Sequence, residues 1–163
     1  MLIVDSLAVL HRWSFVESRL FEVVGPWATS TPEPEVARWF ASVAHHHAWR
    51  SSLWSALVPV LHDVPVPAAP GAWVALLDAV AVPTSTSLRL TGYEVVTAAL
   101  EERYTSVPLD EVADGPVTRA LSLALPDAKE DRRSALSLLA VAPGDEQVAN
   151  HRSSLSALLE GLG

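Results

Sequence analysis

Apolar residues recur along most of this chain at steps of three and four, the spacing that gathers side chains on one face of an α-helix. In the first segment, one such stripe contains Ile3, Leu7, Leu10, Phe21 and Val24. No stretch keeps the alternation of apolar and polar residues that is typical of a half-buried strand. The pattern therefore predicts an all-α protein.

Prolines and glycines divide this pattern into segments, because proline cannot continue a helix and glycine readily ends one. Gly25-Pro26 is expected to end the first helix. The stretch STPEPE, with Ser30 or Thr31 as the capping residue, predicts the start of the second. That helix is expected to end before HDVPVPAAPG, residues 62–71, whose prolines and glycine predict a loop.

The second half of the chain predicts a third helix over residues 71–107, interrupted at Pro83 and again by Gly92. A fourth helix is predicted from the DGP stretch, with Asp114 as its cap, to about Ala140, and Pro126 is an irregularity inside it. A short helix over 148–162 follows. Four main helices in 163 residues predict one domain, residues 1–163, built as an antiparallel four-helix bundle with a kinked or broken third helix.

Composition excludes several classes of function. A net charge of −8 without a basic cluster argues against nucleic-acid binding, and the absence of cysteine excludes disulfides and thiol catalysis. No apolar run approaches the ~18 residues of a membrane span, and the first residues lack the features of a signal peptide. We therefore expect a cytoplasmic protein. The sequence contains no phosphate-binding, dinucleotide-binding or serine-nucleophile motif, so whether it is an enzyme stays open.

Each main helix has one ionisable residue near the middle of its apolar stripe, where a bundle interior should be apolar. These residues are Glu17, His47, Glu94 and Asp131. Isolated buried charges cost several kcal/mol, so such groups are expected to meet one another or to coordinate a metal ion. A shift of one residue in the assumed register would instead turn any of them towards solvent. A purely structural His–carboxylate pair is the other alternative.

The triplet His45-His46-His47 cannot converge on one ion, because successive helical residues point about 100° apart. The spacing favours His47 as the inward residue. His46 is expected to point sideways, towards a neighbouring helix or Trp49, and His45 to lie on the flank.

Two long stretches, HRWSFVESRLFEVVGPWATSTPEPEVARWFASVAHHHAWRSSLW and GPVTRALSLALPDAKEDRRSALSLL, resemble the ferritin-like superfamily. More narrowly, the chain is similar to small actinobacterial ferritin-like proteins without an assigned activity, over most of residues 5–140. The resemblance implies a four-helix bundle. In members with two irons, helices 1 and 3 each provide a Glu, and helices 2 and 4 each provide a Glu-x-x-His pair.

Carried onto this chain, the resemblance matches Glu17 to the first carboxylate, His47 to the histidine of the second helix and Glu94 to the carboxylate of the third. Ala44 and Ala128 stand where the two bridging glutamates would be, and Asp131 replaces the second histidine. A two-iron centre needs those carboxylates to offset the charge of its metals.

Two hypotheses follow. The first is a ferritin-like protein that has lost its two-iron site and acts by binding or assembly, with a homodimer through helix faces as one form. Its tryptophans would fill the core or contribute to such a face. The second is an oxidoreductase or metal binder in which Glu17, His47, Asp131 and Glu94 hold a single Fe, Mn or Zn ion. The sequence does not identify a small-molecule ligand.

Overall fold

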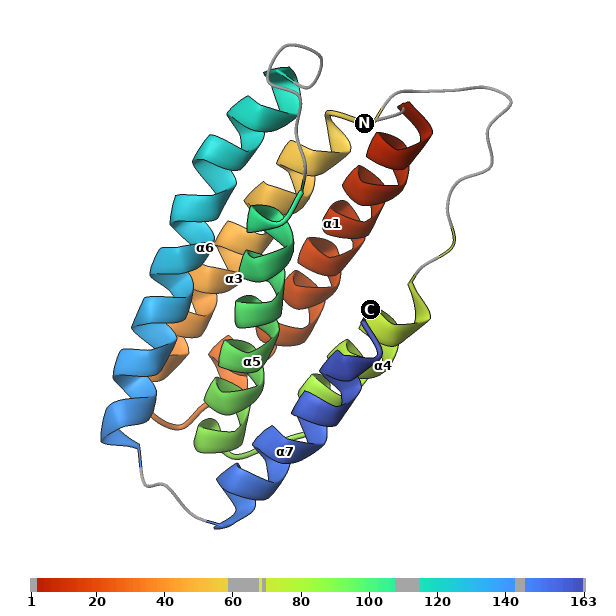
Figure 1. Ribbon diagram of the computed structural model, residues 1–163. Coiled ribbons are helices and arrows are strands. Elements are labelled where there is room, and N and C mark those ends of the chain that lie inside the picture. Colours follow the sequence, from red (N-terminus) through yellow and green to blue (C-terminus); the bar gives the residue numbers. More distant parts are fainter. Residues whose placement is uncertain (1–2, 59–67, 69, 108–114, 143–145, 163) are drawn as a thin grey trace.

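The computed structural model describes residues 3–58, 68, 70–107, 115–142 and 146–162. All regular structure in these ranges is helical, which confirms the predicted all-α class (Figure 1). The helices are α1 (Ile3–Val24), α2 (Trp27–Ser30), α3 (Pro34–Ser55), α4 (Gly71–Ala81), α5 (Thr86–Thr105), α6 (Gly115–Val141) and α7 (Glu146–Glu160).

The four longest helices, α1, α3, α5 and α6, run along the length of the molecule (Figure 1). α1 packs antiparallel to α3, and α5 packs antiparallel to α6, while α3 contacts α6. α3 and α5 run in the same direction (Figure 1). α4 and α7 lie together on one side, against α1 and α5 respectively.

The helix ends follow the proline and glycine signals in part. The amide of Gly25 donates to the carbonyl of Phe21 at 2.9 Å, and α1 ends there as predicted. The predicted cap of the second helix is wrong: α3 begins after Glu33, which makes no side-chain cap. The two candidate hydroxyls are used elsewhere, since Ser30 donates to the carbonyl of Pro26 and Thr31 accepts from Arg89.

The predicted third helix is broken at Pro83, which separates α4 from α5. Ser85 caps the new helix by accepting from the amide of Leu88. The predicted interruption at Gly92 is wrong, because α5 passes through it without a break. A side chain is missing there for a packing reason: a Cβ on Gly92 would lie 3.2 Å from a methyl carbon of Val80 in α4.

Further along, α6 continues through Pro126, and α7 occupies the predicted place of the short C-terminal helix. The predicted loop over 62–71 and the predicted cap Asp114 fall mostly or wholly outside the described residues.

The core lies between the long helices and contains most of the aromatic rings. Four tryptophans are buried, as predicted for rings that fill the core: Trp13, Trp27, Trp54 and Trp73. Trp49, in contrast, is 40% exposed. Phe21, expected on the inner stripe of the first helix, is 46% exposed, and its neighbour Leu20 is fully buried in its place. Leu7, Leu10 and Val24, also on the predicted stripe, are buried, so Phe21 is the misplaced residue among those whose burial is described.

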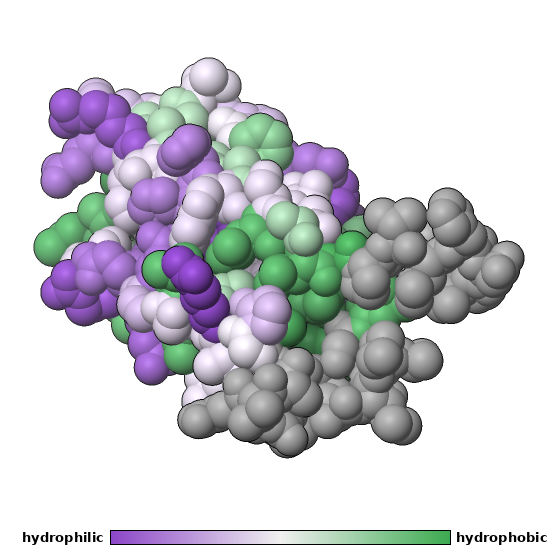
Figure 2. Space-filling view, turned by 90° about the horizontal axis from the view of Figure 1, so that it is seen from above, coloured by the Kyte–Doolittle hydropathy of each residue, from purple (hydrophilic) through white to green (hydrophobic). Residues whose placement is uncertain are grey.

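Hydrophobic residues also gather at the end of the molecule where α3 and α5 end (Figure 2). Leu57, Val58 and Val107, which follow these two helices, are partly buried against the core. No helix within the described residues combines the length and the apolar character that crossing a membrane requires.

Candidate functional site

Glu17 of α1 and His47 of α3 face each other in the centre of the molecule. Both side chains are completely buried, and the Nδ1 atom of His47 lies 2.5 Å from Oε2 of Glu17. Because each residue lies at mid-height on the inner face of its helix, the antiparallel packing of α1 and α3 brings them level. The predicted inward orientation of both groups is confirmed.

Arg50 lies one turn beyond His47 on the same face of α3, and it is also completely buried. Its Nε donates to Oε1 of Glu17 at 2.8 Å, and its Nη1 donates to Oδ2 of Asp131 on α6 at 2.8 Å. Nη1 also donates to Oδ2 of Asp127. A single guanidinium thus connects α1, α3 and α6.

Arg50 was not among the residues predicted from the sequence, although a signal for it was present. Val43, His47, Arg50 and Trp54 step by four, three and four, so Arg50 belongs to the inner stripe as clearly as His47 does. Arginine is rarely buried unless it is paired, and the pairing partners lie on other helices.

Two tyrosines of α5 complete the network from the opposite side. The hydroxyl of Tyr93 lies 3.0 Å from Nε2 of His47, and the hydroxyl of Tyr104 donates to Oε1 of Glu17 at 2.5 Å. Trp54 donates from Nε1 to the hydroxyl of Tyr104 at 2.8 Å. The tyrosines share a face of α5 because they are about three turns apart.

The charges in this network follow from burial and from the nearest partners. Burial alone would raise the pKa of Glu17, but the charge of Arg50 and the contacts with His47 and Tyr104 outweigh it, so the pKa is lowered. For His47 burial prevails, and with the nearby Arg50 it lowers the pKa despite the attraction of Glu17. Burial also opposes the charge of Arg50, but Glu17 and Asp131 outweigh that effect and raise its pKa. At neutral pH, Glu17 is therefore an anion, His47 neutral and Arg50 a cation.

Both ring nitrogens of His47 have polar partners. Nδ1 lies 2.5 Å from Oε2 of Glu17 and 2.9 Å from Nη2 of Arg50, so the imidazole contacts the anion and the cation at the same atom. On the other side of the ring, Nε2 lies 3.0 Å from the hydroxyl of Tyr93, whose pKa is raised well above its usual value by burial. The imidazole is therefore held at both nitrogens.

Asp131 links the buried network to the edge of the molecule. Its side chain is 3% exposed, and its Oδ1 lies 2.7 Å from Nδ1 of His46. Oδ1 of Asp127 lies 3.9 Å from the same nitrogen, and the side chains of His46 and Asp127 are 34% and 29% exposed. His46 therefore turns sideways towards α6, as predicted, while His45 is exposed on the flank.

Glu94 is buried as predicted, but the structure places it apart from the other three candidates. Its Oε1 accepts from Arg132 of α6 at 3.2 Å, and its Oε2 accepts from Arg152 of α7 at 2.6 Å. Glu94 follows Tyr93 in the sequence, so it points about 100° away around α5. The expectation that all four groups meet is corrected: Glu94 fastens α6 and α7 to α5, and the central network contains Glu17, His47 and Asp131.

The residues at the centre do not fit a two-iron site. Ala44 and Ala128, at the positions of the bridging glutamates, are buried and offer no ligand atom. The guanidinium of Arg50 occupies the space between Glu17 and Asp131, where ions would have to bind. A cation that hydrogen-bonds these carboxylates repels metal ions electrostatically.

A different group of potential metal ligands lies at the edge of the network. His46, Asp127 and Asp131 each offer a ligand atom, and these atoms lie within 4.8 Å of one another. Asp131 is the one member of this group that the sequence predicted as a metal ligand. His46 was predicted to point sideways, and Asp127, four residues before Asp131, was not predicted to belong to a site.

Comparison with family models, with curated proteins and with solved structures finds no match for this chain.

Proposed function

We propose that this chain is a ferritin-like four-helix-bundle protein whose central polar site is neutralised by Arg50 and not by metal ions, and which acts by binding or assembly. The observation that carries this proposal is the position of Arg50, between Glu17 and Asp131. A guanidinium is charged at every accessible pH. It therefore offsets the buried carboxylates permanently, as irons would in a two-iron protein.

The chain topology supports the ferritin-like assignment. Two antiparallel helix pairs, α1 with α3 and α5 with α6, are joined by one long connection that makes α3 and α5 parallel. A single long crossover is typical of ferritin-like bundles, whereas simple up-and-down bundles have only short connections.

Metal analysis of protein purified without an affinity tag, after dialysis, tests this proposal. We expect a content well below two ions per chain, with no change in the Glu17→Gln variant. Two irons per chain, lost in Glu17→Gln and in His47→Ala but retained in the surface variant Glu33→Gln, would contradict it.

The group His46, Asp127 and Asp131 favours a second candidate, a protein that binds a single Fe, Mn or Zn ion. Both Oδ2 atoms of the two aspartates accept from Arg50, whereas both Oδ1 atoms lie on the side of His46. An ion on the Oδ1 side would therefore leave the contacts of Arg50 intact. One imidazole with two carboxylates is a ligand set suited to Fe, Mn or Zn, and the partial exposure of the site gives an ion access.

Titration with Mn²⁺ or Zn²⁺ separates the two candidates. Binding of one ion per chain, weakened at least about ten-fold by Asp127→Asn, would support the metal binder. Asp78→Asn, at an exposed aspartate on α4, is the matched control and should leave the affinity unchanged. Without saturable binding, or with equal effects of both variants, the second candidate fails and the first stands.

A further inference from the structure

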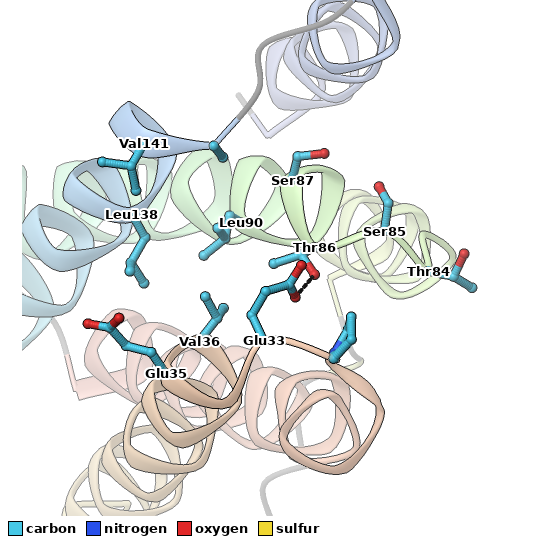
Figure 3. A pocket seen from close by; sticks show the side chains of 12 residues that line it. Glu33, Glu35, Val36, Thr84, Ser85, Thr86, Ser87, Leu90, Leu138 and Val141 are labelled. Atoms are coloured by element: carbon cyan, nitrogen blue, oxygen red, sulfur yellow. Dashed lines mark hydrogen bonds between the residues drawn. The ribbon is translucent and has the colours of Figure 1, made fainter.

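A pocket of about 550 Å³ lies at the end of the molecule where α3 and α5 begin and α6 ends (Figures 1 and 3). Its size falls within the range of small-molecule sites, about 300–1,000 Å³. The pocket shares no residue with the central network, so its role is independent of the function proposed above.

The inner part of the pocket is apolar. Val36, Leu90 and Leu138 point into it from three different helices (Figure 3). Val141, at the end of α6, also lines the pocket and is 83% exposed. Apolar side chains from α3, α5 and α6 therefore form a concave surface that leaves part of its area in contact with water.

The polar part of the pocket is acidic. Glu33 and Glu35 line it together with hydroxyl side chains at the start of α5, and none of the described residues that line it is basic. Glu33 accepts from the hydroxyl of Thr86 at 2.6 Å, which fixes its carboxylate above the pocket (Figure 3). Glu35 is exposed, and its side chain makes no hydrogen bond or ion pair with another described residue.

Helix ends explain only part of this arrangement. Glu35 lies in the first turn of α3, and Glu33 lies beside the first turn of α5, where negative charge is favourable. The favourable position of negative charge at the start of a helix does not explain why an apolar concave surface lies beside the carboxylates. It also leaves the carboxylate of Glu35 without a direct partner.

We propose that this pocket binds a small organic amine. The apolar body of the ligand would cover Val36, Leu138 and Val141, and its ammonium group would lie beside the carboxylate of Glu35. Charge complementarity selects a cation, because the described part of the lining has two carboxylates and no basic side chain. The net charge of −8 of the whole chain also attracts a cation and repels an anion.

The methyl groups of Val36, Leu90, Leu138 and Val141 allow a direct test, because all four residues line the pocket. We would record methyl NMR spectra during titration with 2-phenylethylamine, with the neutral 2-phenylethanol and with the anionic 3-phenylpropanoate. We expect saturable shifts with the amine, at a Kd on the order of 1 mM for a ligand of this size. The alcohol should bind about two- to five-fold more weakly, as the loss of an exposed ion pair implies, and the acid more weakly still.

Glu35→Gln should reduce the affinity for the amine to that for the alcohol and leave the affinity for the alcohol unchanged. Glu146→Gln is the matched control, because Glu146 is also an exposed glutamate in the first turn of a helix, α7. Leu138→Ala should lower the affinities for the amine and for the alcohol by the same factor. Equal binding of amine and alcohol, equal effects of the two glutamine substitutions, or an absence of saturable shifts would each overturn the proposal.

Discussion

The substitution Arg50→Met tests whether the buried guanidinium holds the central network together. Methionine keeps the helix propensity and the apolar stem but removes the cation. The variant leaves Glu17 and Asp131 buried without the charge that each of them contacts. The carboxylate of Glu17 would keep its hydrogen bonds from His47 and Tyr104.

Removing one partner of a buried ion pair costs about 3–5 kcal/mol. A typical domain has an unfolding free energy of about 5–15 kcal/mol, so the variant should still fold in most of that range. With a urea m-value of about 2 kcal/mol/M, the unfolding midpoint should decrease by about 1.5–2.5 M. Arg133→Met is the matched control, because Arg133 pairs with Glu130 on the surface of α6, and its loss should change the midpoint little.

The pH dependence gives a second and more specific signature. In the natural protein the pKa of Glu17 is lowered, against the effect of burial, chiefly by the charge of Arg50. Its contribution to stability is therefore present above the unfolded-state pKa of about 4.3 and is lost as the pH falls through the folded-state value. Without Arg50, burial prevails and the pKa of Glu17 should exceed the unfolded value. The variant should then lose stability as the pH rises from about 4.3 through that raised pKa.

Urea unfolding at several pH values between acid and neutral measures both effects. The difference in unfolding free energy between the natural protein and Arg50→Met should grow as the pH rises towards 7. A cost no larger than that of Arg133→Met, or a cost independent of pH, would refute the argument that Arg50 compensates buried carboxylates.

Three further predictions concern neighbours of Arg50 and the packing of α5. Tyr104→Phe should destabilise the protein by about 1–3 kcal/mol in urea unfolding, because Trp54 and Glu17 each lose a buried partner; a neutral effect would mean that water replaces the hydroxyl. Because the pKa of His47 is lowered in the folded protein, this residue takes up a proton in the unfolded state before it does so in the folded state. The unfolding free energy should therefore fall as the pH drops below about 6.5, and His47→Gln should remove this part of the pH dependence. An unchanged profile in this variant would show that His47 does not titrate as argued. Gly92→Ala should destabilise the protein, because the new Cβ would press on Val80. Overpacking costs about 1–3 kcal/mol, whereas the gain in helix propensity is about 1 kcal/mol. Gly115→Ala is the control, because nothing lies within 4 Å of its Cβ, and an equal gain in stability in both variants would contradict the close approach of Val80 to Gly92.

Local signals in the sequence were sufficient for most of the fold. Helical periodicity and the proline and glycine positions predicted the long helices, the end of α1 at Gly25 and the break at Pro83, because these features depend on backbone geometry within a few residues. The same periodicity placed Glu17, His47 and Asp131 on inner faces. It failed at Gly92, where the reason for a glycine is a side chain of another helix, Val80.

The tertiary structure alone decided which polar groups meet. Periodicity gives the face of a residue but not its rotation relative to a neighbouring helix, so it does not distinguish Glu94 from the other candidates. Only the packing of α7 against α5 makes Arg152 a partner of Glu94. For the same reason Arg50 was missed, although its spacing matched the stripe. A buried cation is stable only where anions from other helices surround it, and Glu17 and Asp131 lie 33 and 81 residues away in the chain. The sequence by itself determined the helices and their inner faces. Packing decided whether the centre holds the guanidinium of Arg50 or a metal ion, because this depends on the relative positions of charged groups on different helices.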